Sequence, residues 1–247
     1  MPHVNHDSKT KVFHFKQFDV VNEISAMKVN TDGVLLGAWA LPVRHRCVWD
    51  IGTGTGVIAI MMAQRFPEAT VHAVEIDPLS AKEATCNFLS SPWSERLFLH
   101  EGDFRQISSS LPAPDLIVCN PPYFDGHKHN LVSPLARKAT ARHEASLSCS
   151  TILEEASRRL NDDGRLCLIS PANRENDIQW DAAGSRMYVE RKTYVISRVG
   201  KAPSRILWRF SKTACSPEVD NLAIRDADNG FTTDYSQLLS PFYINID

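Results

Sequence analysis

Residues 47–56 read Cys-Val-Trp-Asp-Ile-Gly-Thr-Gly-Thr-Gly, an apolar run that ends at an acid and continues into a glycine-rich turn. Residues 57–65 follow, and they are apolar enough to form a packed helix that ends before Pro67. A strand, a glycine turn and a helix in this order are typical of sheets that bind ligands at the carboxyl ends of their strands. Glycines there allow a tight bend and close approach of a ligand to the backbone. The stretch therefore predicts a ligand site.

Outward from this stretch, short apolar runs alternate with longer helical stretches. The strands expected in chain order are 47–51, 70–76, 97–103, 115–120, 165–170, 188–196 and 204–210. Alternation of strands with helices predicts a parallel sheet that is covered on both faces. Only residues 198–203 join the last two strands, which is too short for a helical crossover, so these two should be antiparallel neighbours. The expected fold is α/β, with a doubly wound, seven-stranded, mostly parallel, Rossmann-like sheet and an antiparallel last strand.

Composition sets wide limits on function. The 247 residues include 27 Lys and Arg against 29 Asp and Glu, and 43% are hydrophobic, as in one ordinary globular α/β domain. The net charge of −2 excludes a histone-like polycation but permits nucleic-acid binding through a local basic patch. No apolar run approaches the roughly 20 residues that span a bilayer, and the polar N-terminus does not resemble a signal peptide. The six cysteines show no CxxC pattern, so we expect buried thiols in the cytoplasm and no metal.

Polar residues stand at the carboxyl ends of the first four expected strands. They are Asp50, Glu75, Asp103 and Asn120. Such strand ends share one edge of a parallel sheet, so these side chains should converge on one crevice. An acid beside the glycine loop, Asp50, would repel a pyrophosphate and suits a cationic ligand that carries an α-amino group and a sulfonium. Glu75 is placed to accept hydrogen bonds from ribose hydroxyls. Asp103 can accept from an adenine amino group, with Phe104 or Ile76 packing on the ring.

The tetrad Asn120-Pro121-Pro122-Tyr123 follows the fourth expected strand. Its two prolines fix the backbone and remove two N–H donors, which makes the loop stiff and rich in acceptors. The side-chain oxygen of Asn120 and the carbonyl of Pro121 can both accept from one planar amino group, while Tyr123 can stack on a flat ring. Two acceptors on one amine orient its lone pair toward an electrophile and stabilise the positive charge that develops on nitrogen. The loop therefore predicts methylation of an amine without a covalent enzyme intermediate.

With these motifs in place, the sequence resembles the bacterial tRNA1(Val) adenine-37 N6-methyltransferase family of class I S-adenosylmethionine-dependent methyltransferases. The resemblance covers nearly the whole chain. It is carried by residues 13–18, 26–39, 50–56, 91–96, 115–123 and 241–243. One departure is Asn30, where the family pattern has Gly before Thr-Asp-Gly. Asn tolerates a positive φ better than most residues, so the departure is expected to be minor.

The resemblance implies S-adenosyl-L-methionine as the methyl donor and N6 of adenine 37 in a tRNA anticodon loop as the acceptor. It implies a donor site in which Lys28, Thr31 and Asp32 border the methionine end, Asp50, Gly52 and Gly54 hold the amino acid, Glu75 holds the ribose, and Asp103 and Phe104 hold the adenine. Thr53, Ile76 and Asn120 are also expected to bind the donor. The tetrad that begins at Asn120 would hold the target base. That base must be splayed out of its stack, at a cost of a few kcal/mol.

The remaining expectations concern organisation and RNA contact. Residues 1–46 should form an N-terminal extension or lid on the cofactor site, and residues 47–247 the catalytic part of a single domain that acts as a monomer. A basic cluster shortly after the tetrad is expected to contact RNA phosphates through Lys128, Arg137, Lys138 and Arg142. A second basic run, 186–212, fits an RNA face and ordinary solvated faces equally well.

Three other functions remain open from the residues. A release-factor glutamine N5-methyltransferase also uses Asn-Pro-Pro-Tyr, but it carries a larger helical domain before the glycine loop than the 49 residues here. A ribosomal RNA guanine-N2 methyltransferase shares such a tetrad as well. A non-catalytic RNA-binding module with a retained fold is disfavoured by the intact Asp50, Glu75 and Asn120.

Overall fold

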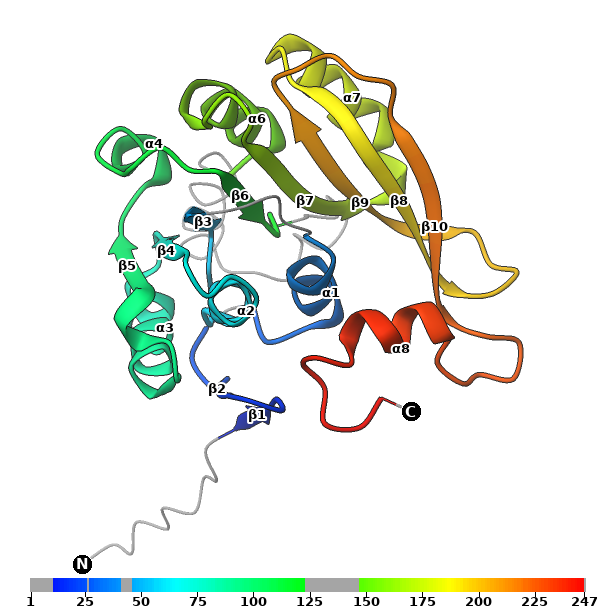
Figure 1. Cartoon of the computed structure of the whole chain (residues 1–247), viewed down its shortest axis with the longest axis horizontal. Helices are drawn as coiled ribbons and strands as arrows, with labels where there is room; N and C mark the ends of the chain where they lie inside the picture. The colour runs from blue at the N-terminus through cyan, green and yellow to red at the C-terminus, as the bar shows by residue number, and fades with distance from the viewer. Residues whose placement is uncertain (1–10, 26, 41–45, 123–146, 247) are drawn as a thin grey trace, which may run out of the picture.

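The fold is built on one large sheet. The computed structural model describes residues 11–25, 27–40, 46–122 and 147–246. Its eight-stranded sheet has the order β10-β8-β9-β7-β6-β3-β4-β5 (Figure 1). The strands are β3 (Cys47–Ile51), β4 (Thr70–Glu75), β5 (Leu97–Glu101), β6 (Leu116–Cys119), β7 (Arg165–Pro171), β8 (Tyr188–Arg198), β9 (Pro203–Ser211) and β10 (Glu218–Arg225). Strand β9 is antiparallel to both β7 and β8, and the other neighbours are parallel.

Helices cover both faces of this sheet (Figure 1). They are α1 (Thr31–Trp39), α2 (Val57–Arg65), α3 (Pro78–Ser90), α4 (Phe104–Ile107), α6 (Cys149–Arg159), α7 (Glu175–Gly184) and α8 (Thr233–Leu239), with short 3-10 turns η1 (Ser94–Arg96) and η3 (Ala172–Arg174). Val48 belongs to one hydrophobic core and Trp49 to the other, because alternate residues of β3 face opposite layers. Within the described ranges, none of the helices has the length and apolar character needed to cross a bilayer.

The sequence prediction is confirmed for the α/β class, for the parallel core and for the antiparallel strand expected at 204–210, which is β9, but it missed one strand that follows it. Strand β10 lies at the sheet edge, parallel to β8, with Asp220 opposite Thr193. Of its residues only Leu222 is buried. This edge strand contains two acids, and its only apolar run, residues 222–224, is three residues long, so it was not recognised and the count of seven was wrong.

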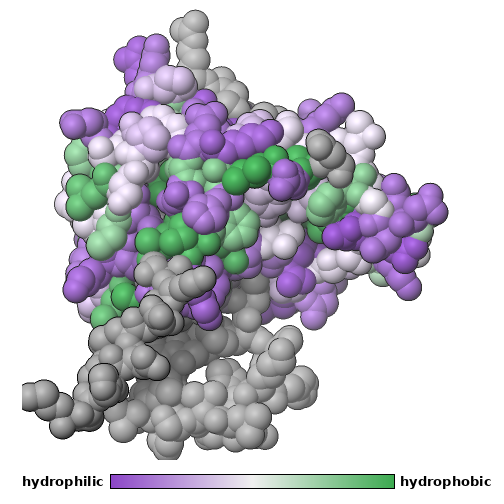
Figure 2. Space-filling view, turned by 90° about the horizontal axis from the view of Figure 1, so that it is seen from below, coloured by the Kyte–Doolittle hydropathy of each residue, from purple (hydrophilic) through white to green (hydrophobic). Residues whose placement is uncertain are grey.

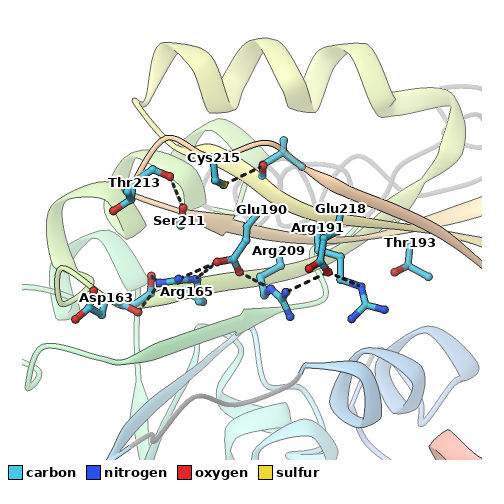
Figure 3. A network of polar contacts seen from close by, with 12 residues as sticks. Asp163, Arg165, Glu190, Arg191, Thr193, Arg209, Ser211, Thr213, Cys215 and Glu218 are labelled. Carbon is cyan, nitrogen blue, oxygen red and sulfur yellow. Dashed lines mark hydrogen bonds and ion pairs between the residues drawn. The ribbon is translucent and has the colours of Figure 1, made fainter.

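Ion pairs cross the sheet from β7 to β10 (Figure 3). The carboxylate of Glu190 accepts from the guanidinium groups of Arg165, at 2.8 Å, and Arg209, at 2.5 Å. Arg191 pairs with Asp220 on the edge strand. Further carboxylate pairs join Arg191 to Glu218, Lys192 to Glu175, Arg205 to Asp32 and Lys212 to Asp162. Five of the eight cations in the basic run 186–212 are therefore paired with carboxylates inside the protein, which favours a structural role for most of this run.

Both ends of the chain contribute to the same side of the molecule (Figure 1). The N-terminal hairpin consists of β1 (Val12–His14) and β2 (Asp19–Val21). The ring of Phe15 lies 5.9 Å from that of Tyr243, measured between centroids. Lys16 adds two hydrogen bonds, each 2.8 Å long, from its backbone N–H to the carbonyl of Phe242 and from Nζ to that of Ser240. The two ends thus close one part of the core together.

The surface seen from below mixes hydrophilic and hydrophobic residues (Figure 2). Single exposed hydrophobic side chains such as Ile244, at 53% exposure, are ordinary on a folded protein. The more informative features of this molecule are its buried polar groups, such as Asp50, Glu75 and Glu83.

The charge network yields a stability prediction. We expect Glu190→Gln to lower the free energy of unfolding by about 1–3 kcal/mol, because two half-buried guanidinium groups lose their shared counter-charge. Burial alone would raise the pKa of Glu190, but hydrogen bonds and charges from Arg165 and Arg209 outweigh burial and lower it. Its stabilising contribution is therefore present above the ordinary carboxyl pKa and is lost as pH falls through the lowered value.

Denaturant unfolding near neutral pH measures this loss. The matched control is Glu154→Gln, since that carboxylate is exposed and lies 3.8 Å from Arg158, and it should change stability by less than about 0.5 kcal/mol. Equal losses in the two variants would contradict the role given to Glu190.

Candidate functional site

The glycine turn between β3 and α2 rests on a buried acid. Asp50 is fully buried, and its Oδ2 accepts from the hydroxyl of Thr53 at 2.5 Å and from the N–H of Ala59 at 3.0 Å. Burial raises the pKa of Asp50 to about 7, against the lowering effect of these two hydrogen bonds. The second oxygen, Oδ1, is buried and has no partner among the described residues. Asp50 therefore braces the turn and keeps one acceptor for another donor.

A second acid holds the turn from the neighbouring strand. The side chain of Glu75 is nearly buried, with Oε2 accepting from the N–H of Gly54 and Oε1 from that of Asp77, both at 2.9 Å. Gly54 has a φ of +57°, which favours glycine, and a Cβ there would lie 3.4 Å from Oγ of Ser25. The remaining lone pairs of Glu75 can still accept from a ligand's hydroxyl groups.

Two neighbouring hollows lie at this edge of the sheet. The first is an open hollow that encloses about 330 Å³, with the solvent at its mouth included, and is lined by Met27, Lys28, Asn30, Gly33, Gly52, Thr53, Gly54, Thr55, Val57, Ile58 and Asn120. The second encloses about 190 Å³, again with open solvent included, and is lined by Gly52, Val74, Ile76, Gly102, Phe104 and Leu147. Gly52 lines both, so an elongated ligand can lie with a polar end in the first hollow and an apolar ring in the second.

Several predicted donor-site residues meet at these hollows. Lys28, Thr53 and Asn120 line the first, and Ile76 and Phe104 line the second. Phe104 is buried, and its ring meets that of Trp49 edge to face at a centroid distance of 6.0 Å.

Three other predicted residues have different surroundings. Thr31 and Asp32 begin α1 beside the first hollow but do not line it, and Asp32 pairs with Arg205 at 2.8 Å. Asp103 caps the N-terminus of α4, and its carboxylate is engaged by the backbone and guanidinium of Arg105. These hydrogen bonds lower the pKa of Asp103, so its carboxylate already has donors where an adenine amine was expected.

Asn120 presents a defined amide to the first hollow. Its Nδ2 donates to Sδ of Met27 at 3.6 Å, and a Cβ on Gly33 would lie 3.7 Å from the same nitrogen. The nitrogen therefore faces the N-terminal segment, which leaves Oδ1 as the acceptor for a substrate amine. Pro121 is buried and Pro122 partly so, as expected of a stiff loop. The other predicted contacts, Tyr123, Lys128, Arg137, Lys138 and Arg142, lie outside the described residues.

The structure adds residues that sequence reasoning missed. Met27 and Gly33 belong to the N-terminal block that carried the family resemblance, so that block was the available signal, whereas nothing in the sequence marks Leu147. The departure from the family pattern at Asn30 suggested a positive φ, but the residue does not adopt one. Its φ is −140°, and its side chain caps α1 by accepting from the N–H of Gly33 at 2.9 Å.

The buried acid generates a pH prediction. The folded-state pKa of about 7 exceeds the ordinary value of 3.8, so the folded protein keeps a proton that the unfolded chain releases between these values. Asp50 should therefore make the free energy of unfolding fall as pH rises through this window. We expect Asp50→Asn to remove that fall while keeping an acceptor for Thr53 and Ala59.

Denaturant midpoints at about pH 5 and about pH 8 measure the effect. The control, Asp228→Asn, alters an exposed acid and should leave the wild-type pH dependence in place. A wild-type slope retained in Asp50→Asn would contradict the assignment to this carboxyl group.

Comparison with solved structures shows the fold. A predicted O-methyltransferase from Agrobacterium tumefaciens matches with a TM-score of 0.66 and 22% identity, over 85% of this chain and 96% of its own. A methyltransferase from Pyrococcus furiosus matches with a TM-score of 0.57 and 22% identity, over 79% and 90%. Both are similar to this chain in architecture, and at this level of identity the likeness concerns the fold alone.

Sequence comparison shows the family. The methyltransferase small domain model matches residues 9–180. A tRNA1(Val) (adenine(37)-N6)-methyltransferase from Porphyromonas gingivalis is 42% identical over 95% of each chain. Enzymes of the same name from Actinobacillus succinogenes and Yersinia pseudotuberculosis are 40% and 38% identical over 94% of this chain, and over 97% and 92% of their own. Matched at 38–43% identity along nearly its whole length, this chain belongs to the tRNA1(Val) (adenine(37)-N6)-methyltransferase family.

Proposed function

We propose that this protein transfers the methyl group of S-adenosyl-L-methionine to N6 of adenine 37 in the anticodon loop of tRNA1(Val). One observation carries the proposal: Asn120, which opens the tetrad, lines the same hollow as the glycine turn. The side chain of Asn120, which can accept a hydrogen bond from a substrate amine, thus lies next to the proposed site of the methyl donor. The chain is also 38–43% identical to enzymes named for this reaction.

The residues present fit this donor. Oδ1 of Asp50, which has no hydrogen-bond partner in the described part of the chain, is a buried acceptor beneath the turn, which suits a ligand with a cationic amino-acid end. Glu75 keeps lone pairs for ribose hydroxyls, and the second hollow offers Ile76 and Phe104 to an adenine ring. When bound, S-adenosyl-L-methionine supplies a methyl group made electrophilic by its sulfonium.

The chain's own part in the reaction is to place the amine. Oδ1 of Asn120 and the carbonyl of Pro121 accept from the two N–H groups of the adenine amine, which directs its lone pair to the donor side. Both acceptors also stabilise the positive charge that grows on nitrogen. Tyr123 stacks on the base, and the stiff prolines limit the entropy lost on binding.

The N-terminal segment completes the donor site. We assign residues 1–46 to an extension over the cofactor and residues 47–247 to the catalytic part of a single domain. Met27, Lys28, Asn30 and Gly33 support this division, since they line the first hollow. The enzyme acts as a cytoplasmic monomer without a metal. Light scattering of the purified protein tests the oligomeric state, and metal analysis tests the metal content.

We assign RNA contact to the basic cluster of Lys128, Arg137, Lys138 and Arg142. These cations follow the target-base loop closely in sequence, whereas most of the run 186–212 is paired within the protein. Phosphate contacts would position the anticodon loop while the target adenine is splayed out.

The proposed function is tested by incubating the protein with labelled donor and total tRNA that lacks this mark. We expect label in N6-methyladenosine of tRNA1(Val), identified by nucleoside mass spectrometry of tRNA fractions. A folded protein that leaves tRNA unlabelled would refute the proposal. Parallel incubations with release factor and with unmodified ribosomal RNA test the alternatives, and label on a glutamine or a guanine there would identify the other enzyme class instead.

Asn120→Ala should lower turnover by two to four orders of magnitude, about 3–5 kcal/mol, because the amine loses its main acceptor. Affinity for the donor, measured by calorimetry, should change much less. Activity that stays within about tenfold of wild type would contradict the role given to this side chain.

Charge reversal tests the RNA assignment. Lys138→Glu and Arg142→Glu should each weaken tRNA binding at low salt and leave donor binding unchanged. Arg209→Glu serves as the control, because this cation is already paired with Glu190, so it should affect stability more than tRNA affinity. Unchanged tRNA affinity in the first two variants would exclude this path.

A further inference from the structure

A buried carboxylate on α3 holds the start of the N-terminal wall, the segment from Glu23 to Lys28 whose last two residues line the first hollow. Glu83 is 3% exposed, and its Oε2 accepts from the N–H groups of Glu23 at 2.8 Å and Ile24 at 2.6 Å. Its Oε1 accepts from the N–H of Ser25 at 3.0 Å. The hydrogen bonds from three consecutive N–H groups to one carboxylate are charge-assisted, so they hold residues 23–25 more firmly than neutral hydrogen bonds would.

One turn further along α3, Asn87 joins the same segment to the glycine turn. It is 1% exposed, and its Oδ1 accepts from the N–H of Val21 at 2.8 Å. Its Nδ2 donates to the carbonyls of Val21, at 3.0 Å, and Thr55, at 2.8 Å. One amide therefore fastens the end of β2 and the turn between β3 and α2 to each other.

The fastened segment leads directly into the first hollow. Ser25 donates to the carbonyl of Met27 at 3.2 Å, and Lys28 Nζ donates to the carbonyl of Glu23 at 2.5 Å. Met27 and Lys28 both line the hollow, and Met27 accepts from the amide of Asn120. A continuous chain of hydrogen bonds thus runs from α3 to Asn120, the first residue of the Asn-Pro-Pro-Tyr loop.

We propose that Glu83 and Asn87 are positioning residues: they hold residues 21–25 against the glycine turn and thereby set the donor pocket. The inference rests on the proposed function and deepens it, since it concerns the same donor site. Neither side chain touches the hollow itself, so each acts through the backbone that it holds.

The two side chains can be altered without removing what holds α3 in place. The helix packs through apolar residues, among them Ala81, Ala84 and Phe88, all of which are buried in the core. Its N-terminus is capped separately by Asp77. Loss of the hydrogen bonds of Glu83 and Asn87 should therefore loosen the N-terminal wall while α3 itself stays packed on the core.

The test uses Glu83→Gln and Asn87→Asp in the full chain. The first substitution would set an amide donor against backbone N–H groups, and the second would set a carboxylate against the carbonyls of Val21 and Thr55. We expect the Kd for S-adenosyl-L-methionine, measured by calorimetry, to rise about tenfold in each variant, which corresponds to the net value of one or two hydrogen bonds. The donor KM should rise with it, while kcat at saturating donor and tRNA affinity stay within about threefold.

Hydrogen exchange separates positioning from general destabilisation. The amides of Val21, Glu23, Ile24 and Ser25 should exchange faster in the variants, with core strands protected as in wild type. Glu95→Gln is the matched control, because that acid is exposed near the end of α3, and it should leave exchange and donor Kd unchanged.

Two results would overturn the proposal: a donor Kd within twofold of wild type in both variants, or exchange that accelerates equally throughout the core. A wild-type protein that binds donor but does not methylate tRNA refutes the proposed function alone, and the calorimetric comparison still decides the positioning role. A wild-type protein that fails to bind the donor refutes both.

Discussion

The turn between β3 and α2 can hold its shape because buried polar side chains on separate elements form hydrogen bonds with it and with the start of α2. Asp50 supports it from the strand beneath, Glu75 from the adjacent strand and Asn87 from α3. The sheet order places β6, β3 and β4 side by side, because the chain runs from β3 to β4 and β5 on one side and then returns to β6 on the other side of β3. Neighbouring strands lie about 4.8 Å apart, so Asn120 after β6, the glycine turn after β3 and Glu75 at the end of β4 come within reach of one ligand.

Local patterns were sufficient for much of this arrangement. The run from Cys47 to Gly56 predicted its strand, turn and following helix, because burial and tight bending leave direct marks in residue choice. Parallel topology then brought Glu75 and Asn120 to one edge without further information. The roles given to single residues go beyond these patterns. Asp103, for instance, is engaged by Arg105 two positions away, and a hydrogen bond of that kind depends on the loop's final shape.

What sequence reasoning missed depends on contacts between distant residues. Strand β10 is stabilised by its pairing with β8 and by Arg191, which reaches Asp220 across 29 positions of chain. Pairing between strands also explains why the basic run 186–212 is mostly structural. Its cations have no evident partner in the sequence, but in the fold acids from neighbouring strands pair with them. Long-range pairs of this type cannot be deduced from composition or periodicity, because many alternative partners have the same local pattern.

The packing of the N-terminal hairpin on the segment after α8 bears on the order in which the protein folds. Phe15 and Lys16 contact residues 240–243, which lie more than 220 positions further along the chain. Contacts at such a separation carry a large entropic cost of loop closure, whereas the strands around the glycine turn pair over much shorter distances. We therefore expect this part of the core to form late, after the sheet has brought the two segments close together.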